Sequence, residues 1–247
     1  MKLWKKLLIV FTLFVLAIIV AGMVWSASSS YSAEPAVQAY LESSDRVLVV
    51  RDGWVSFQPT DQSPKVGFIF YPGGNVDHLA YAPPLHEIAA QGFLVVNVPM
   101  PFNLAVLAPE KALDVIEAYP GIETWVIGGH SLGGAMAARL VYTHPDEVQG
   151  LVLWAAYPAD SDSLAASDIP VLSLYGTMDG VASPRKIERR FELLPEETRY
   201  LALEGANHAQ FGFYGAQNRD NPPEITRQEQ QTLIVNATVD FLRSFEP

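Results

Sequence analysis

Residues 125–134 decide the fold, and they read Trp125-Val126-Ile127-Gly128-Gly129-His130-Ser131-Leu132-Gly133-Gly134. An apolar run typical of a buried strand ends in Gly-x-Ser-x-Gly, and an alanine-rich helical pattern follows at once. Glycines on both sides of the serine permit a turn that is too tight for ordinary side chains. We therefore expect the Ser131 hydroxyl at the positive end of a helix, where a developing oxyanion is stabilised.

A turn of small residues between a strand and a helix also serves packing alone, so this motif needs support from the rest of the chain. His130 fills the variable position before the serine, where we expect its backbone to matter more than its ring.

Apolar strand patterns alternate with helical patterns on both sides of this motif. We expect a strand or hairpin over residues 46–57 and further strands over 66–71, 93–98, 124–127, 148–156, 171–175 and 199–203. We expect helices over 84–91, 109–118, 132–143, 183–194 and 225–245. This alternation predicts an α/β fold with a mostly parallel central sheet and helices on both faces.

The N-terminus differs in composition from the rest of the chain. A short basic segment is followed by residues 7–25, which carry no charge and are long enough to cross a bilayer. We predict an uncleaved membrane anchor over residues 1–25, a polar linker over 26–45 and one α/β domain over 46–247, outside the cytoplasm. The alternative is a signal peptide cleaved after Ser28, which would release a secreted protein.

Composition excludes several classes of function. The chain has 247 residues, a formal net charge of −11 and no cysteine. The negative charge argues against a nucleic-acid partner, and also against attachment to anionic lipid by charge, so membrane attachment is expected through the apolar segment alone. The missing cysteines exclude disulfides, thiolate metal sites and a cysteine nucleophile. The oligomeric state is left open.

A serine nucleophile needs a base and an acid that orients the base. In an open parallel sheet these groups gather at the carboxyl ends of the strands. Asp179 follows the strand at 171–175 and His208 follows the strand at 199–203, so the order is Ser131, Asp179, His208. Each residue alone would more often be a turn or surface residue, but together they occupy the loops that a catalytic triad requires.

The oxyanion of an acyl-transfer reaction needs two N–H donors. One is expected at Leu132, directly after the serine. The other is expected in the loop after the strand at 66–71, and we assign it to Gly74, with Asn75 as the neighbouring alternative. Asn75, Met100 and Phe211 lie in strand-end loops and are candidate substrate-binding residues, although the aromatic side chain could equally pack in the core.

With these motifs, the chain resembles the α/β-hydrolase superfamily, and within it the small, lid-poor proteins related to dienelactone hydrolase and bacterial carboxylesterases. The resemblance covers residues 47–245. Gly129-His130-Ser131-Leu132-Gly133 matches the nucleophile motif, whereas Tyr71-Pro72 stands where a His-Gly pair is often found. Dienelactone hydrolases use a cysteine, so their activity is not transferred. The resemblance implies hydrolysis through a serine acyl-enzyme.

The sequence therefore predicts a serine hydrolase that cleaves a small-molecule ester, without metal or organic cofactor. A peptidase or amidase and an acyltransferase would use the same triad and remain open. A non-catalytic binding protein on this fold is a further alternative, although such a protein would normally have lost a triad residue.

Overall fold

The computed structural model describes residues 4–7, 9–12, 14 and 30–246. The chain divides into two units, Met1–Ser30 and Tyr31–Pro247. In the first unit, residues 4–7, 9–12 and 14 are helical. Within the described residues, no helix is both long enough and apolar enough to span a bilayer. Most of the predicted anchor, including residues 15–25, lies outside the described part of the chain.

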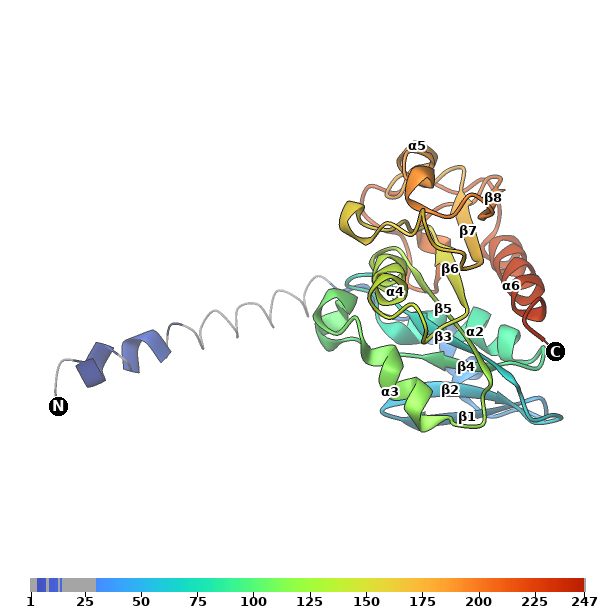
Figure 1. Cartoon of the computed structure of the whole chain (residues 1–247), viewed down its shortest axis with the longest axis horizontal. Helices are drawn as coiled ribbons and strands as arrows, with labels where there is room; N and C mark the ends of the chain where they lie inside the picture. Colours follow the sequence, from blue (N-terminus) through green and yellow to red (C-terminus); the bar gives the residue numbers. More distant parts are fainter. Residues whose placement is uncertain (1–3, 8, 13, 15–29, 247) are drawn as a thin grey trace. The chain divides into compact units, whose positions relative to one another are not determined.

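An eight-stranded sheet forms the centre of the second unit (Figure 1). The strands are β1 (Val47–Asp52), β2 (Trp54–Pro59), β3 (Val66–Tyr71), β4 (Leu94–Asn97), β5 (Thr124–His130), β6 (Gly150–Trp154), β7 (Val171–Gly176) and β8 (Arg199–Leu203). Their order in space is β1-β2-β4-β3-β5-β6-β7-β8. β2 is antiparallel to both β1 and β4, and every other pair is parallel. The predicted mostly parallel sheet is confirmed.

Helices cover both faces of this sheet, as predicted. The α-helices of the second unit are α2 (Ala82–Ala89), α3 (Lys111–Ala118), α4 (Leu132–Thr143), α5 (Pro184–Glu188) and α6 (Arg227–Arg243). Alternate residues of β3 belong to different cores: Phe68 and Phe70 share one with α2 and α6, whereas Ile69 and Tyr71 share the other with α3 and α4. Figure 1 shows α3 and α4 on the opposite side of the sheet from α2 and α6.

Short 3-10 helices complete the described fold. They are η1 (Pro35–Leu41), η2 (His78–Tyr81), η3 (Pro101–Asn103), η4 (Ala105–Leu107), η5 (Asp160–Asp162), η6 (Phe191–Leu193) and η7 (Ala209–Phe211). The helix predicted over 183–194 is divided into α5 and η6. The ring centroids of Phe191 and Tyr200 are 3.7 Å apart. This packing against β8 accompanies the break in the predicted helix.

The predicted linker is structured where the structure describes it. Tyr31 forms a parallel bridge with Val76, and η1 buries Val37 and Leu41 against the core of the α2 face. Arg227, at the start of α6, binds both carboxylate oxygens of Glu34. Residues from Tyr31 onward therefore belong to the same unit as the sheet, whereas a linker would make no such contacts.

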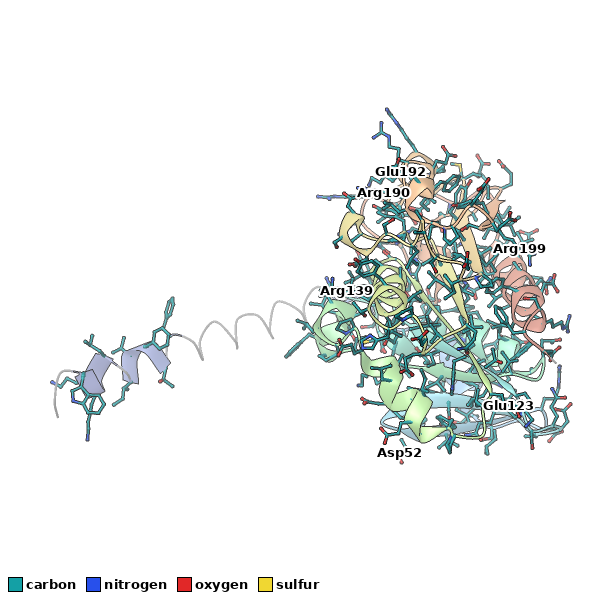
Figure 2. All side chains as sticks on the ribbon, viewed as in Figure 1. Asp52, Glu123, Arg139, Arg190, Glu192 and Arg199 are labelled. Carbon is teal, nitrogen blue, oxygen red and sulfur yellow. The ribbon has the colours of Figure 1, made fainter. Side chains whose placement is uncertain are left out.

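Charged side chains lie mostly on the outside of the second unit. Figure 2 shows labelled examples that extend outward around it, namely Asp52, Glu123, Arg139, Arg190, Glu192 and Arg199. Aspartate and histidine side chains that are fully buried are therefore conspicuous, because burial of an ionisable group is costly unless it is paired. Two such groups lie where β7 and β8 end.

Candidate active site

Ser131 occupies a strained turn between β5 and α4. Its φ of 51° and ψ of −120° lie in a region that L-residues rarely adopt. The turn fits because Gly129 and Gly133 lack side chains: a Cβ on Gly129 would lie 2.7 Å from the Tyr71 carbonyl oxygen, and one on Gly133 would overlap that oxygen. The Ser131 N–H donates to the Trp154 carbonyl at 2.9 Å, which ties the turn to the end of β6.

Asp179 and His208 form a buried pair. The Asp179 Oδ2 atom lies 2.7 Å from Nδ1 of His208, and both side chains are fully buried. The other carboxylate oxygen, Oδ1, accepts the N–H groups of Val181 and Ala182 at 2.8 and 2.7 Å. The carboxylate is thus held on both oxygens, and it fixes the imidazole in one orientation. The pairing of Asp179 with His208 is thus present, and their roles as acid and base stay a prediction.

A second carboxylate joins the loops that carry this pair. Asp220 accepts the N–H of Gly180 at 3.0 Å, next to the acid, and those of His208 and Ala209 at 3.3 and 2.8 Å. Sequence reasoning missed Asp220, because an aspartate in a polar loop carries no local signal for a contact 40 residues away.

The end of β5 lies beside His208. The His130 ring centroid is 4.4 Å from that of His208, and Ser131 is the next residue along the chain. Nε2 of His208 is buried and has no hydrogen-bond partner among the described residues. The structure thus joins Asp179 to His208 directly and places Ser131 near them. The Ser131 hydroxyl makes no hydrogen bond to Nε2 of His208 in the described part of the chain.

The two expected oxyanion donors lie against each other. A Cβ on Gly74 would be 3.0 Å from Cδ2 of Leu132, so the loop after β3 and the start of α4 are in contact. Leu132 is the first residue of α4, and its N–H has no partner within the helix. The N–H groups on either side of Gly74 are already used: Gly73 donates to the Tyr81 hydroxyl and Asn75 to the Asn103 carbonyl. This favours Gly74 over Asn75 as the donor.

The candidate substrate-binding residues differ in position. Asn75 is partly exposed and has a φ of 58°, with its Oδ1 buried and unpartnered within the described residues. Met100 is buried in the core of the α4 face. Phe211 is fully buried and stacks on His130 at a centroid distance of 5.3 Å. Phe211 therefore packs against His130 in the core, and its role as a substrate contact stays a prediction.

The ring of His130 also differs from expectation. It is fully buried, and its Nδ1 lies 2.8 Å from the Tyr81 hydroxyl. Burial, together with the nearby His208, lowers the pKa of His130 well below its usual value. The variable position of the nucleophile motif thus carries a neutral buried histidine with a specific partner.

In the described part of the chain, no group of three or more His, Cys, Asp or Glu side chains is placed to hold a metal ion. At the carboxyl end of the sheet, the buried Asp179–His208 pair lies near Ser131 and the N-terminus of α4. Such an arrangement on a doubly covered, mostly parallel sheet defines an α/β protein with a candidate hydrolase site.

Comparison with known proteins agrees with this class. The sequence pattern of the alpha/beta hydrolase family matches residues 67–232, and the chain belongs to this family. A search of curated protein sequences found no match.

Three of the similar solved structures are named as a hydrolase, a lipase and an esterase. A predicted CIB-like hydrolase from Thermoplasma acidophilum has a TM-score of 0.58 and 19% identity, covering 81% of this chain and 98% of that one. A monoacylglycerol lipase from Paleococcus ferrophilus has a TM-score of 0.57 and 18% identity, covering 78% and 98%. The esterase domain of a Rhodothermus marinus protein has a TM-score of 0.59 and 14% identity, covering 80% and 97%. At these identities the likeness establishes the fold.

Proposed function

We propose that this protein is a serine hydrolase that cleaves carboxylic esters through a Ser131–His208–Asp179 triad. The observation that carries the proposal is the buried Asp179–His208 pair, which lies next to a strained serine turn. Burial of an aspartate and a histidine costs free energy even when they are joined at 2.7 Å. This cost favours a role in which the aspartate orients the histidine for catalysis.

In the first half of the reaction, Nε2 of His208 takes the proton of the Ser131 hydroxyl as the oxygen attacks the ester carbonyl. Asp179 holds the Nδ1–H tautomer and stabilises the imidazolium that forms. The N–H groups of Leu132 and Gly74 receive the oxyanion of the tetrahedral intermediate. When this intermediate collapses, the alcohol leaves with the proton from His208, and the acyl group stays on Ser131.

In the second half, His208 takes a proton from water, whose oxygen attacks the acyl-enzyme. The same two amides receive the second oxyanion. Collapse releases the carboxylic acid and returns the proton to Ser131. The complete reaction consumes one ester and one water and gives one alcohol and one carboxylic acid. His208 carries the proton in each step.

An ester substrate is supported by what the similar structures are named. One is a monoacylglycerol lipase and another is an esterase domain. An amide or peptide substrate would use the same residues, and turnover of p-nitrophenyl esters against the matching anilides separates the two classes. We expect ester turnover to exceed anilide turnover.

A fluorophosphonate probe tests the proposal on the full chain. We expect wild type to be labelled at the peptide containing Ser131, and Ser131→Ala to remain unlabelled. For His208→Ala we expect a loss of about 10³-fold or more in kcat, since it removes the base. His144→Ala is the matched control, because His144 lies at the far end of α4 and should leave kcat unchanged. Labelling of Ser131→Ala as strong as that of wild type would refute the proposal.

We also propose that the apolar segment at residues 7–25 attaches the protein to a membrane, with the α/β domain outside the cytoplasm. The support is the length and lack of charge of this segment and the lysines before it. Intact-mass measurement of the protein from its native membranes tests this. A mature chain that begins near residue 29 would mean cleavage and secretion instead.

A further inference from the structure

A buried polar chain links the loop of the proposed oxyanion donor to the nucleophile turn. The Gly73 N–H donates to the Tyr81 hydroxyl at 3.1 Å, and this hydroxyl lies 2.8 Å from Nδ1 of His130. Tyr81 ends η2, and His130 ends β5 directly before Ser131. Both side chains are fully buried. The mechanism above uses neither of them.

The directions of these hydrogen bonds follow from the number of protons available. A phenol has one O–H, and here its oxygen already accepts the Gly73 N–H. A buried O–H without an acceptor is costly, so we assign the Tyr81 O–H as the donor to Nδ1 of His130, the other polar atom within reach. Nδ1 can accept only if the imidazole is neutral with its proton on Nε2, which agrees with the lowered pKa of His130.

Packing reinforces the hydrogen bonds. A Cβ on Gly73 would lie 2.7 Å from Nδ1 of His130 and 2.8 Å from the Tyr81 oxygen. The glycine backbone is thus seated directly against both side chains. The Gly74 N–H belongs to the peptide that joins Gly73 to Gly74, so a rotation of the Gly73 backbone would change the direction of the proposed oxyanion donor.

We propose that Tyr81 and His130 are positioning residues that hold the Gly73–Gly74 backbone, so that the Gly74 N–H is aimed at the oxyanion. This inference rests on the proposed function for its catalytic consequence, but the positioning itself does not depend on turnover. Donors act through preorganisation, so a loop that reorients during the reaction stabilises the transition state less. Ground-state binding of the ester should depend little on the same amide.

The test compares Tyr81→Phe with Tyr119→Phe. Tyr119 follows α3 directly and is the matched control, because its hydroxyl also accepts an N–H, that of Trp54 Nε1 at 3.2 Å. Each variant therefore removes one hydroxyl that accepts one N–H. Only the Tyr81 hydroxyl accepts an N–H of the oxyanion loop.

Turnover gives the first readout. Loss of a whole oxyanion donor costs about 10²–10³-fold in kcat, and a misaimed donor should cost less, about tenfold. We expect Tyr81→Phe to lower kcat for a p-nitrophenyl ester about tenfold with KM nearly unchanged. Tyr119→Phe should leave kcat within about twofold of wild type. Equal kcat values for the two variants would overturn the inference.

Amide hydrogen exchange of the full chain gives the second readout, which needs no activity. Exchange at Gly73 should quicken about tenfold in Tyr81→Phe and stay unchanged in Tyr119→Phe. Unchanged exchange at Gly73 in Tyr81→Phe would overturn the positioning role. If wild type does not turn over esters, the proposed function fails and the catalytic part of this inference with it, while the exchange result still decides whether Tyr81 holds the loop.

His130 is tested by rescue. Oδ1 of an asparagine stands where Nδ1 of the histidine stands, so His130→Asn keeps an acceptor for Tyr81, whereas His130→Leu, of similar size, does not. We expect kcat to fall about tenfold further in His130→Leu than in His130→Asn. Identical kcat values for the two variants would overturn the role of His130.

Discussion

The carboxylate of Asp179 lies 2.7 Å from Nδ1 of His208, and neither side chain is exposed to solvent. Because Nδ1 is the donor in this pair, Nε2 is left as the basic nitrogen. An asparagine at position 179 would present an N–H₂ group to Nδ1 and favour the opposite tautomer. We expect Asp179→Asn to lower kcat by about 10³–10⁴-fold in a steady-state ester assay, with little effect on KM.

The control for this variant is another buried aspartate, Asp162 at the end of η5. Its Oδ1 accepts from Ser161 at 3.0 Å and pairs with Arg139 at 3.5 Å. We expect Asp162→Asn to retain kcat within about threefold, since it touches neither His208 nor the serine turn. If the two variants lost the same activity, burial of charge would explain the effect and orientation of His208 would not.

The backbone strain at Ser131 predicts that replacing this serine by glycine stabilises the protein while it abolishes activity. A φ of 51° raises the free energy of the folded state when the residue has a side chain, but not when it is glycine. We expect Ser131→Gly to be more stable than Ser131→Ala by about 1 kcal/mol in urea unfolding, and both to be inactive. If the alanine variant equalled or exceeded the glycine variant in stability, the turn would not be strained.

Much of the sheet could be predicted from the sequence because its strands are short apolar runs that turn residues interrupt. β3 and β8 begin and end where the sequence predicts. The meeting of Asp179 with His208 could also be predicted, because parallel strands place the loops that follow them at one edge of the sheet.

The partners of the site residues could not be predicted, because they come from distant parts of the chain. The Tyr81–His130 contact joins residues 49 positions apart, and the Asp220–Gly180 contact joins residues 40 apart. No local pattern marks either of them. Tyr31 lies in a polar stretch without periodicity, so its pairing with Val76, beside the oxyanion loop, could not be predicted from the sequence either.

The packing of residues 31–45 predicts where the folded unit begins. The Tyr31 N–H donates to the Asn75 carbonyl at 2.7 Å, and the Asp77 N–H donates to the Tyr31 carbonyl at 2.9 Å. η1 also buries Val37 and Leu41, and burial of each such side chain is worth about 1.5–3 kcal/mol at most. We expect a chain that starts at Arg46 to be less stable than one that starts at Ser30 by about 3 kcal/mol or more in urea unfolding.

The two truncated chains should also differ in ester turnover, because Tyr31 pairs with the backbone on both sides of Val76, close to Gly74. Equal stability and equal kcat would mean that residues 31–45 act as a linker, as their composition alone suggests.

The buried His130 predicts a dependence of stability on pH. Burial holds its pKa in the folded protein well below the ordinary value of 6.5, which the unfolded chain is expected to show. Between these two pKa values the unfolded state binds more protons, so stability is full above about pH 6.5 and falls as the pH drops, by up to about 1.4 kcal/mol per pH unit. His130→Asn removes this titration. We therefore expect its free energy of unfolding, measured in urea between pH 7.5 and about pH 5, to fall less steeply than that of wild type. The other titrating groups are common to both proteins and cancel in the difference, so parallel curves would mean that His130 is not held neutral in the folded state.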